Sequence, residues 1–408
     1  MGVVWGGVVF GTVVGSKDRL YFKYGGQIEI FPPSGVLWLG LAITSFFVGT
    51  LLTRKYKLQF SGKGQEGSRY RYLQTFAFVK IFAAGVTVLL ILWTLVAASK
   101  VGGLGDFIAL MQSDWHYTRR LWPQQKPFPG ARLLYTGLIA CAIYAFTLLG
   151  DLLSRKRGLT SQEKWKLGLL FCLSLGPLAV LPLIVSQRIL IASGLFGGGV
   201  AFLISHRDGV NPLFVVLLAI GGFSVWTTQE IIRTGSTIGP EAILHSIELV
   251  FHYFQVGFSN VTRGSAFMTE RSYGLLSFSF IFEYLFIEDE IKALFLSDFE
   301  AQAGTVKSTG PWNALVTPYL DFGWFGLLLI AGWGYFAQLS YEFARNDRFG
   351  AQIYGLIGAT IIVSFHQQFW SNAAFWFNLG LLIVFNQAPD IVQSIQLNRA
   401  ILSETDSE

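Results

Sequence analysis

An apolar run of 39 residues, 167–205, limits this chain more than any other feature, because it contains a single charged side chain, Arg188. As one straight helix the run would be about 58 Å long, twice the roughly 30 Å of hydrocarbon in a lipid bilayer. The run must therefore fold back on itself as a hairpin. We expect the turn near Ser186-Gln187-Arg188, just after Pro182.

Comparable apolar stretches recur along the chain and predict an all-α polytopic membrane protein, with residues 1–408 forming one membrane domain. Only 13% of the residues are charged, against about 25% in soluble domains, which excludes an ordinary cytosolic enzyme and a disordered chain. The first stretch begins at the initiator Met but lacks the basic region and cleavage motif of a signal peptide, so we count it as a span. The ten predicted transmembrane helices are 2–16, 35–53, 73–98, 132–153, 167–186, 189–205, 212–227, 318–340, 350–365 and 374–390.

The loops between these spans alternate in their content of Lys and Arg. One set holds 14 basic residues in 47 positions, in the segments 54–72, 154–166, 206–210 and 341–350. The other set holds only 13 in 151 positions, in the segments 17–34, 99–131, 187–188, 228–317 and 366–373. The positive-inside rule therefore places the first set and both termini in the cytoplasm. The net charge of +5 is explained by this topology and gives no support to a nucleic-acid partner.

Two of the predicted outer segments are large, 99–131 and 228–317. The second is too long for a mere connector, and loops of such length are usually functional. It contains ten acidic and five basic residues, so it is not a polybasic lipid anchor. A helix is predicted to begin near Pro240, with apolar residues recurring from Ile243 to Phe254 on one face. A second apolar stretch, 273–287, is a candidate to dip into the membrane.

Four arginines are candidates for binding phosphate. Arg188 lies within the apolar hairpin, where a guanidinium either grips the phosphate of a lipid carrier or extends to the membrane interface. Arg233, Arg263 and Arg271 lie in the large outer loop, each next to Gly, Ser or Thr. They either converge to stabilise a diphosphate leaving group or are separate surface residues.

Glu241, His245, Glu248 and His252 share one face of the helix predicted after Pro240. A His or Glu on that face can act as a general base on a sugar hydroxyl. The alternative is the ordinary polar face of an amphipathic helix. The spacing lacks the H-E-x-x-H pattern of a zinc site, and two cysteines, Cys141 and Cys172, exclude a thiol-rich one. We therefore expect no metal and no cofactor.

Asn313 and Asp321 belong to the last part of the large loop, just before a predicted span. Asp321 either caps that helix or orients an arginine, and Gly323 and Gly326 permit close helix packing. Motifs for nucleotide binding or for a nucleophilic serine are absent, and no span carries a ladder of carboxylates typical of a proton-coupled transporter.

With these features the chain resembles the bacterial oligosaccharide repeat-unit polymerases, the Wzy-type family that makes O-antigen and exopolysaccharide. The resemblance covers the whole layout of many spans, a basic inner side and a large late outer loop. Its sharpest element is an Asn followed by a Y-x-D-F-G-x-x-G entry into the next span. The local elements are Val101-Gly102-Gly103, Ser186-Gln187-Arg188, His252-Tyr253-Phe254 with Asn260, Gly310-Pro311-Trp312-Asn313, and Tyr319 to Gly326.

The resemblance implies a GT-C-like architecture, of the O-antigen polymerase and ligase type, with a partly helical extracytoplasmic loop. It implies a metal-independent glycosyltransferase at the outer face of the bacterial cytoplasmic membrane, acting on undecaprenyl-diphosphate-linked oligosaccharides as donor and acceptor. The base would be His252 or His245, then Glu270. The substrate contacts would be Arg188, Arg233, Arg263, Arg271, Asn313 and Asp321. A chain-length regulator and a flippase are further candidate partners.

Three other functions stay open at this point. An O-antigen ligase would share the layout and the lipid carrier. A flippase or transporter of lipid-linked sugars would need paired charges inside several spans, and this chain offers few beyond Lys80 and Arg188. A scaffold subunit without an active site is the third.

Overall fold

Every regular element that the structure describes is a helix, as the sequence predicts. The computed structural model describes residues 4–8, 32–55, 69–128, 130–154, 160–185, 188–206, 220–224, 227–228, 231, 239–285, 313–345, 347–364, 370 and 372–387. Side chains within a few of these ranges, including Arg188 and His252, are not described. The predicted spans 2–16 and 212–227 lie mostly outside these residues.

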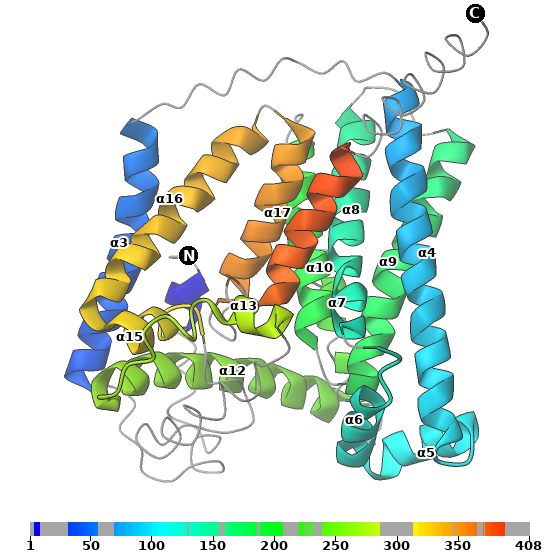
Figure 1. Cartoon of the computed structure of the whole chain (residues 1–408), viewed down its shortest axis with the longest axis horizontal. Coiled ribbons are helices and arrows are strands. Elements are labelled where there is room, and N and C mark those ends of the chain that lie inside the picture. Colours follow the sequence, from blue (N-terminus) through cyan, green and yellow to red (C-terminus); the bar gives the residue numbers. More distant parts are fainter. Residues whose placement is uncertain are drawn as a thin grey trace, which may run out of the picture.

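The core of the molecule is a bundle of roughly upright helices (Figure 1). They are α3 (Pro33–Lys55), α4 (Arg69–Ser99), α8 (Leu138–Ser154), α9 (Ser161–Val185), α10 (Arg188–Ser205), α16 (Gly326–Ala344), α17 (Arg348–Ile362) and the helix Ala373–Gln387. Four segments are long and apolar enough to cross a membrane, namely Pro33–Thr53, Thr75–Ser99, Ala131–Ser154 and Thr317–Ala344. Ile189–Ser205 and Ala373–Gln387 are shorter apolar helices. The chain is therefore a helical membrane protein by length and composition.

The predicted hairpin in 167–205 is confirmed, because α9 ends at Val185 and α10 begins at Arg188. The two helices pack together near Gly194, where an added Cβ would lie 3.1 Å from the side chain of Leu178. The length of the apolar run was therefore sufficient to predict that it forms two helices and not one.

A second group of helices gathers at one end of the bundle (Figure 1). α12 (Pro240–Phe267) lies across this end, nearly perpendicular to the bundle helices, and Pro240 occupies its first turn as predicted. The predicted stretch 273–287, described up to residue 285, forms a loop and the short helix α13 at the same end. The members are α5 (Leu104–Ser113), α6 (Trp115–Gln124), α12 (Pro240–Phe267), α13 (Ser279–Tyr284) and α15 (Thr317–Phe322).

α6 is tied to the bundle by stacked tryptophans. The rings of Trp93 on α4 and Trp122 on α6 stack with centroids 3.8 Å apart. Trp93 also donates to the carbonyl oxygen of Trp122, at 2.8 Å, and Trp122 donates to the hydroxyl of Thr94, at 3.2 Å. Both indole N–H groups are thus satisfied, as buried tryptophans require.

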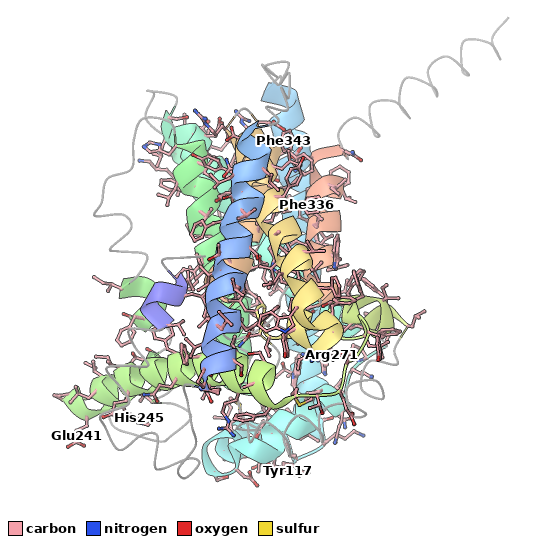
Figure 2. The ribbon with its side chains drawn as sticks, turned by 90° about the vertical axis from the view of Figure 1, so that its left-hand side faces the viewer. Tyr117, Glu241, His245, Arg271, Phe336 and Phe343 are labelled. Atoms are coloured by element: carbon pink, nitrogen blue, oxygen red, sulfur yellow. The ribbon has the colours of Figure 1, made fainter. Side chains whose placement is uncertain are left out.

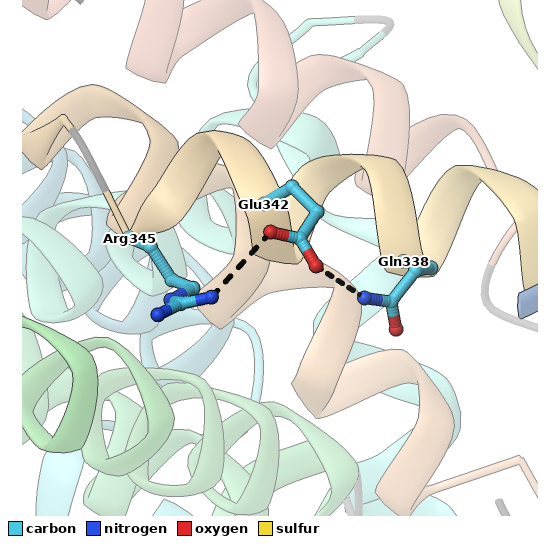
Figure 3. A network of polar contacts seen from close by, with 3 residues as sticks. All are labelled: Gln338, Glu342 and Arg345. Carbon is cyan, nitrogen blue, oxygen red and sulfur yellow. Dashed lines mark hydrogen bonds and ion pairs between the residues drawn. The ribbon is translucent and has the colours of Figure 1, made fainter. Parts of the chain in front are cut away.

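Polar contacts lie near the opposite end of the bundle. Arg348, at the start of α17, forms an ion pair of 2.6 Å with Asp151, near the end of α8. On α16, Gln338 donates to Glu342 at 2.7 Å, and Arg345 lies 3.7 Å from the same carboxylate (Figure 3). The predicted basic and outer loops thus adjoin opposite ends of the bundle as far as the structure describes them.

α3 and α16 approach each other so closely that glycine is required at the contact. A Cβ at Gly334 would collide with the backbone oxygen of Phe46, and one at Gly49 with that of Ala331. Small residues at such crossings are typical of helices that pack within membranes. Gly326 confirms its predicted role in the same way, because its Cβ would collide with the backbone of Pro318.

Replacing Gly334 with leucine is expected to force α3 and α16 apart and to destabilise the protein by about 1–3 kcal/mol or more. Gly332, on the same helix, has open space where a Cβ would lie, with no neighbouring atom within 4 Å, so Gly332→Leu is the matched control. The measurement is the fraction of detergent-solubilised protein that stays monodisperse on size exclusion after heating. Equal losses in both variants would contradict the proposed tight contact.

Candidate functional site

Arg271 is the predicted phosphate-binding arginine whose surroundings are best defined. It follows α12, is half-buried, and lies at the end of the bundle where α12 crosses (Figure 2). Its guanidinium carbon lies 4.5 Å from the centre of the Tyr319 ring, and Nη1 donates to the backbone oxygen of Met268 at 3.4 Å. Among the described residues no carboxylate lies within ion-pair distance of it, whereas Arg345 has Glu342 on its own helix. Within that part of the chain, Arg271 therefore keeps an uncompensated positive charge.

Asp321 holds the loop that follows Arg271. This aspartate is 1% exposed and accepts hydrogen bonds from the hydroxyl of Ser272, from the backbone N–H of Leu276 at 3.2 Å, and from that of Ser277. The backbone N–H of Ser272 also donates to the oxygen of Leu320 at 3.0 Å. Asp321 thus fixes the segment next to Arg271 through hydrogen bonds to that segment, and it caps neither α15 nor α16. None of these bonds is to the guanidinium, so its predicted role of orienting an arginine stays a prediction.

An aromatic cluster lies beneath the Arg271 guanidinium. Trp38 on α3 contacts Tyr319 and Trp324 edge to face, with ring centroids 4.8 Å and 5.7 Å away. The Trp38 indole donates to the backbone oxygen of Leu315 at 2.9 Å, which fixes the cluster to the start of α15. Cation–π contact with such a ring restrains a guanidinium without neutralising it.

Gly323 leaves room for the same guanidinium. Its φ of +58° is a conformation that favours glycine, and a Cβ there would lie 3.3 Å from Nε of Arg271. The D-F-G sequence therefore has two separate physical roles, since Asp321 fixes the loop and Gly323 makes space for the arginine.

Asn313 is fully buried and joins α12 to α15. Its side-chain N–H donates to the oxygen of Gly257 at 2.9 Å, and its side-chain oxygen accepts from the N–H groups of Leu315 and Val316, each at 3.1 Å. These bonds give Asn313 a structural role. Its predicted contact with substrate stays a prediction.

The described residues of the polar face predicted on α12 are not brought to Arg271. Glu241, His245 and Glu248 are exposed within the first nine residues of α12, and Figure 2 shows Glu241 and His245 far from Arg271. Arg263 is half-buried near the other end, with its guanidinium 5.0 Å from the Phe267 ring. At 1.5 Å per residue, His245 lies about 27 Å along the helix from Arg263.

The other predicted site residues have less described surroundings. His252 lies between His245 and Arg263 on α12, and Arg188 is the first residue of α10, but neither side chain is described. Arg233 lies outside the described residues. Glu270 is exposed and directly precedes Arg271.

Seven residues that the sequence did not single out carry buried polar side-chain atoms without hydrogen-bond partners in the described part of the chain. Three of them are Gln255 on α12, with both amide atoms, Ser277, with its hydroxyl, and Trp370, with its indole N–H; the others are Ser193, Ser205, His206 and Thr227. Gln255 is 1% exposed and Ser277 is 5% exposed. Because buried polar atoms in proteins are almost always hydrogen-bonded, such groups are candidates for contacts with water or a ligand. Sequence alone gives no signal for this, because burial depends on distant segments.

α13 is fixed against the start of the last helix. The backbone N–H of Ala373 donates to Glu283 at 2.8 Å, and the Tyr284 hydroxyl donates to the oxygen of Ala373 at 3.1 Å. Burial raises the pKa of the Tyr284 hydroxyl, and the neighbouring Glu283 raises it further. This contact joins the Arg271 loop to a second bundle helix.

Among the described residues no group of three His, Cys, Asp or Glu side chains is placed to hold a metal ion. Comparison of the chain with protein-family models, with curated proteins and with solved structures finds no match.

Proposed function

We propose that this protein is a lipid-carrier-dependent glycosyltransferase that polymerises undecaprenyl-diphosphate-linked oligosaccharide repeat units. The observation that carries the proposal is Arg271, an arginine with no carboxylate partner among the described residues, restrained by Tyr319 at one end of a membrane bundle. A restrained cation at the end of such a bundle suits the anionic head of a lipid whose tail stays in the bilayer.

The reaction requires stabilisation of a leaving group. The anomeric carbon of the growing chain leaves its carrier diphosphate and bonds to a hydroxyl of the incoming repeat unit. The released diphosphate gains negative charge in the transition state, and Arg271, with Arg263 as a second candidate, would stabilise that charge. The loop held by Asp321 favours this role, because preorganised groups need no reorganisation during the reaction.

The acceptor hydroxyl must lose its proton to a base. His252 is favoured over His245, because on α12 it lies about 16 Å from Arg263, whereas His245 lies about 27 Å away. Gln255 follows His252 by three residues, hence on the same side of α12, and its buried amide lacks a partner among the described residues. A sugar hydroxyl is a suitable partner for such an amide. Glu270 remains the alternative base.

The proposed location is the bacterial cytoplasmic membrane, with the site facing outward. The distribution of Lys and Arg supports this orientation, because the poorer loops adjoin the end of the bundle that carries Arg271. Arg188, Arg233, Asn313 and Asp321 are retained as proposed substrate contacts, and the chain-length regulator and flippase as proposed partners.

The test uses purified full-length protein in detergent or liposomes, mixed with a lipid-diphosphate repeat unit. We expect a ladder of products that grows by one repeat unit per band, and we expect the same ladder when a chelator is present, because arginines supply the positive charge. A band that stays at one repeat unit with the native substrate would contradict the polymerase. A ladder abolished by chelator and restored by Mg²⁺ would contradict the metal-independent mechanism.

The same assay separates the two other membrane functions. A ligase would transfer glycan only when a lipid A core acceptor is added, and it would not extend the lipid-linked unit by itself. A flippase would change the side of the membrane on which the unit is found but not its size.

A further inference from the structure

The first half of α12 differs from its second half in burial. Residues 255–262 are all buried, including Gln255 and Phe258. Of the residues from 241 to 248 with described side chains, Ser246 alone is buried. The first half therefore extends beyond the helices that cover the second half, and Figure 2 shows this end projecting to one side of the bundle.

The exposed half carries an apolar stripe. Ile243 and Ile247 are 47% and 39% exposed. Spacings of four, seven and four residues connect Ile243, Ile247, Phe254 and Phe258, so these lie on one side of the helix. Phe258 belongs to the hydrophobic core and Phe254 packs against it. The stripe is therefore a continuation of the face that α12 turns toward the bundle.

The opposite face of this half is polar. Glu241, His245 and Glu248 are exposed, and Figure 2 shows Glu241 and His245 on the side of α12 that points away from the bundle. α12 thus turns an apolar face toward the level of the bundle helices and a charged face away from them. This division is typical of helices that lie in a membrane interface.

The depth of α12 relative to the spans is fixed by its crossing with α3. The backbone of Thr262 touches Gly35, two residues after the beginning of the candidate span Pro33–Thr53. That span exposes Leu37 and Leu51 to 57% and 59%, as expected for contact with lipid chains. α12 therefore lies where the apolar surface of the bundle ends, at the level of the lipid headgroups.

We propose that the first half of α12 is an interfacial helix whose stripe of Ile243 and Ile247 inserts into the adjacent leaflet of the bilayer. A helix of this kind buries its apolar face at the boundary of headgroups and acyl chains while its charged face stays in water. The inference concerns the membrane and not the glycan, so it stands or falls independently of the proposed enzymatic activity.

The test places an environment-sensitive fluorophore (NBD) on single cysteines in full-length protein reconstituted in phosphatidylcholine liposomes. The exposed native Cys172 is first replaced by serine, while Cys141 is buried. Ile243→Cys and Ile247→Cys probe the stripe separately, and Glu241→Cys and Glu248→Cys are the matched controls on the polar face. We expect doxyl-labelled lipid to quench most of the fluorescence at 243 and 247, and aqueous iodide to quench most of it at 241 and 248.

Two results would overturn the proposal. Iodide quenching of all four positions would place the whole half-helix in water. Protection of 243 and 247 from both quenchers, together with disulfide cross-linking between copies through these cysteines, would identify a protein–protein interface instead. No substrate is present, so neither result depends on catalysis.

Discussion

Replacing Arg271 with alanine is expected to stop chain elongation while leaving the protein folded. The variant removes the charge that we propose to stabilise the departing diphosphate, and loss of a single preorganised group of this kind costs about 100- to 1000-fold in rate. The fold should tolerate the change, because the described contacts of Arg271 are one long hydrogen bond of 3.4 Å and one ring contact. The measurement is the rate of appearance of the second band in the product ladder, together with the size-exclusion profile.

Two further variants sharpen this result. Arg271→Lys keeps the positive charge but loses the planar guanidinium, which suits a diphosphate and stacks on Tyr319. We therefore expect its activity to lie between that of the Arg271→Ala variant and that of the wild type. Arg345→Ala removes an arginine from the opposite end of the bundle, where it pairs with Glu342, and should elongate normally. Wild-type rates in Arg271→Ala would remove Arg271 from the proposed site.

The sequence correctly predicted those helices that are determined by residues close together in the chain. The α9–α10 hairpin follows from an apolar run twice as long as a bilayer is thick, and the start of α12 follows from Pro240 ahead of an apolar repeat. Predicted span ends were less accurate, because packing decides where a helix stops. α17 contains 15 residues, from Arg348 to Ile362, where the sequence predicts a span over 350–365.

The site was harder to predict, because its contacts join residues far apart in the chain. Asp321 accepts hydrogen bonds from Ser272, Leu276 and Ser277, and Asn313 donates one to Gly257. Three segments therefore meet that no local pattern connects, namely part of α12, the loop 272–277 and the stretch 313–321. Helical periodicity correctly placed His245 on one face with Glu241. It did not show that this half of α12 extends past the bundle, about 27 Å from Arg263, because periodicity gives a direction around a helix but not its surroundings.

Replacing Asp321 with alanine is expected to release the segment 272–277 and to abolish elongation with it. The carboxylate accepts three hydrogen bonds in a buried site, and each donor left without its acceptor costs roughly 1–3 kcal/mol. Asp321→Asn keeps one accepting oxygen but directs an N–H₂ group at other donors, so its effect should be smaller. Ser272→Ala should be the mildest of the three, because the carboxylate keeps the N–H groups of Leu276 and Ser277.

Hydrogen exchange separates this effect from general destabilisation. In Asp321→Ala the amides of Leu276 and Ser277 should exchange much faster, while the stacked Trp93 and Trp122 region keeps its wild-type protection. Asp114→Ala is the control, since Asp114 accepts a single N–H, that of Tyr117, at the start of α6, and its loss should cost about 1 kcal/mol locally. If Asp321→Ala elongates poorly while exchange in 272–277 is unchanged, Asp321 acts on the substrate and not on the loop. If exchange rises and elongation is normal, the orientation of Arg271 by this loop is not needed for the reaction, and the preorganisation on which the proposed mechanism depends is wrong.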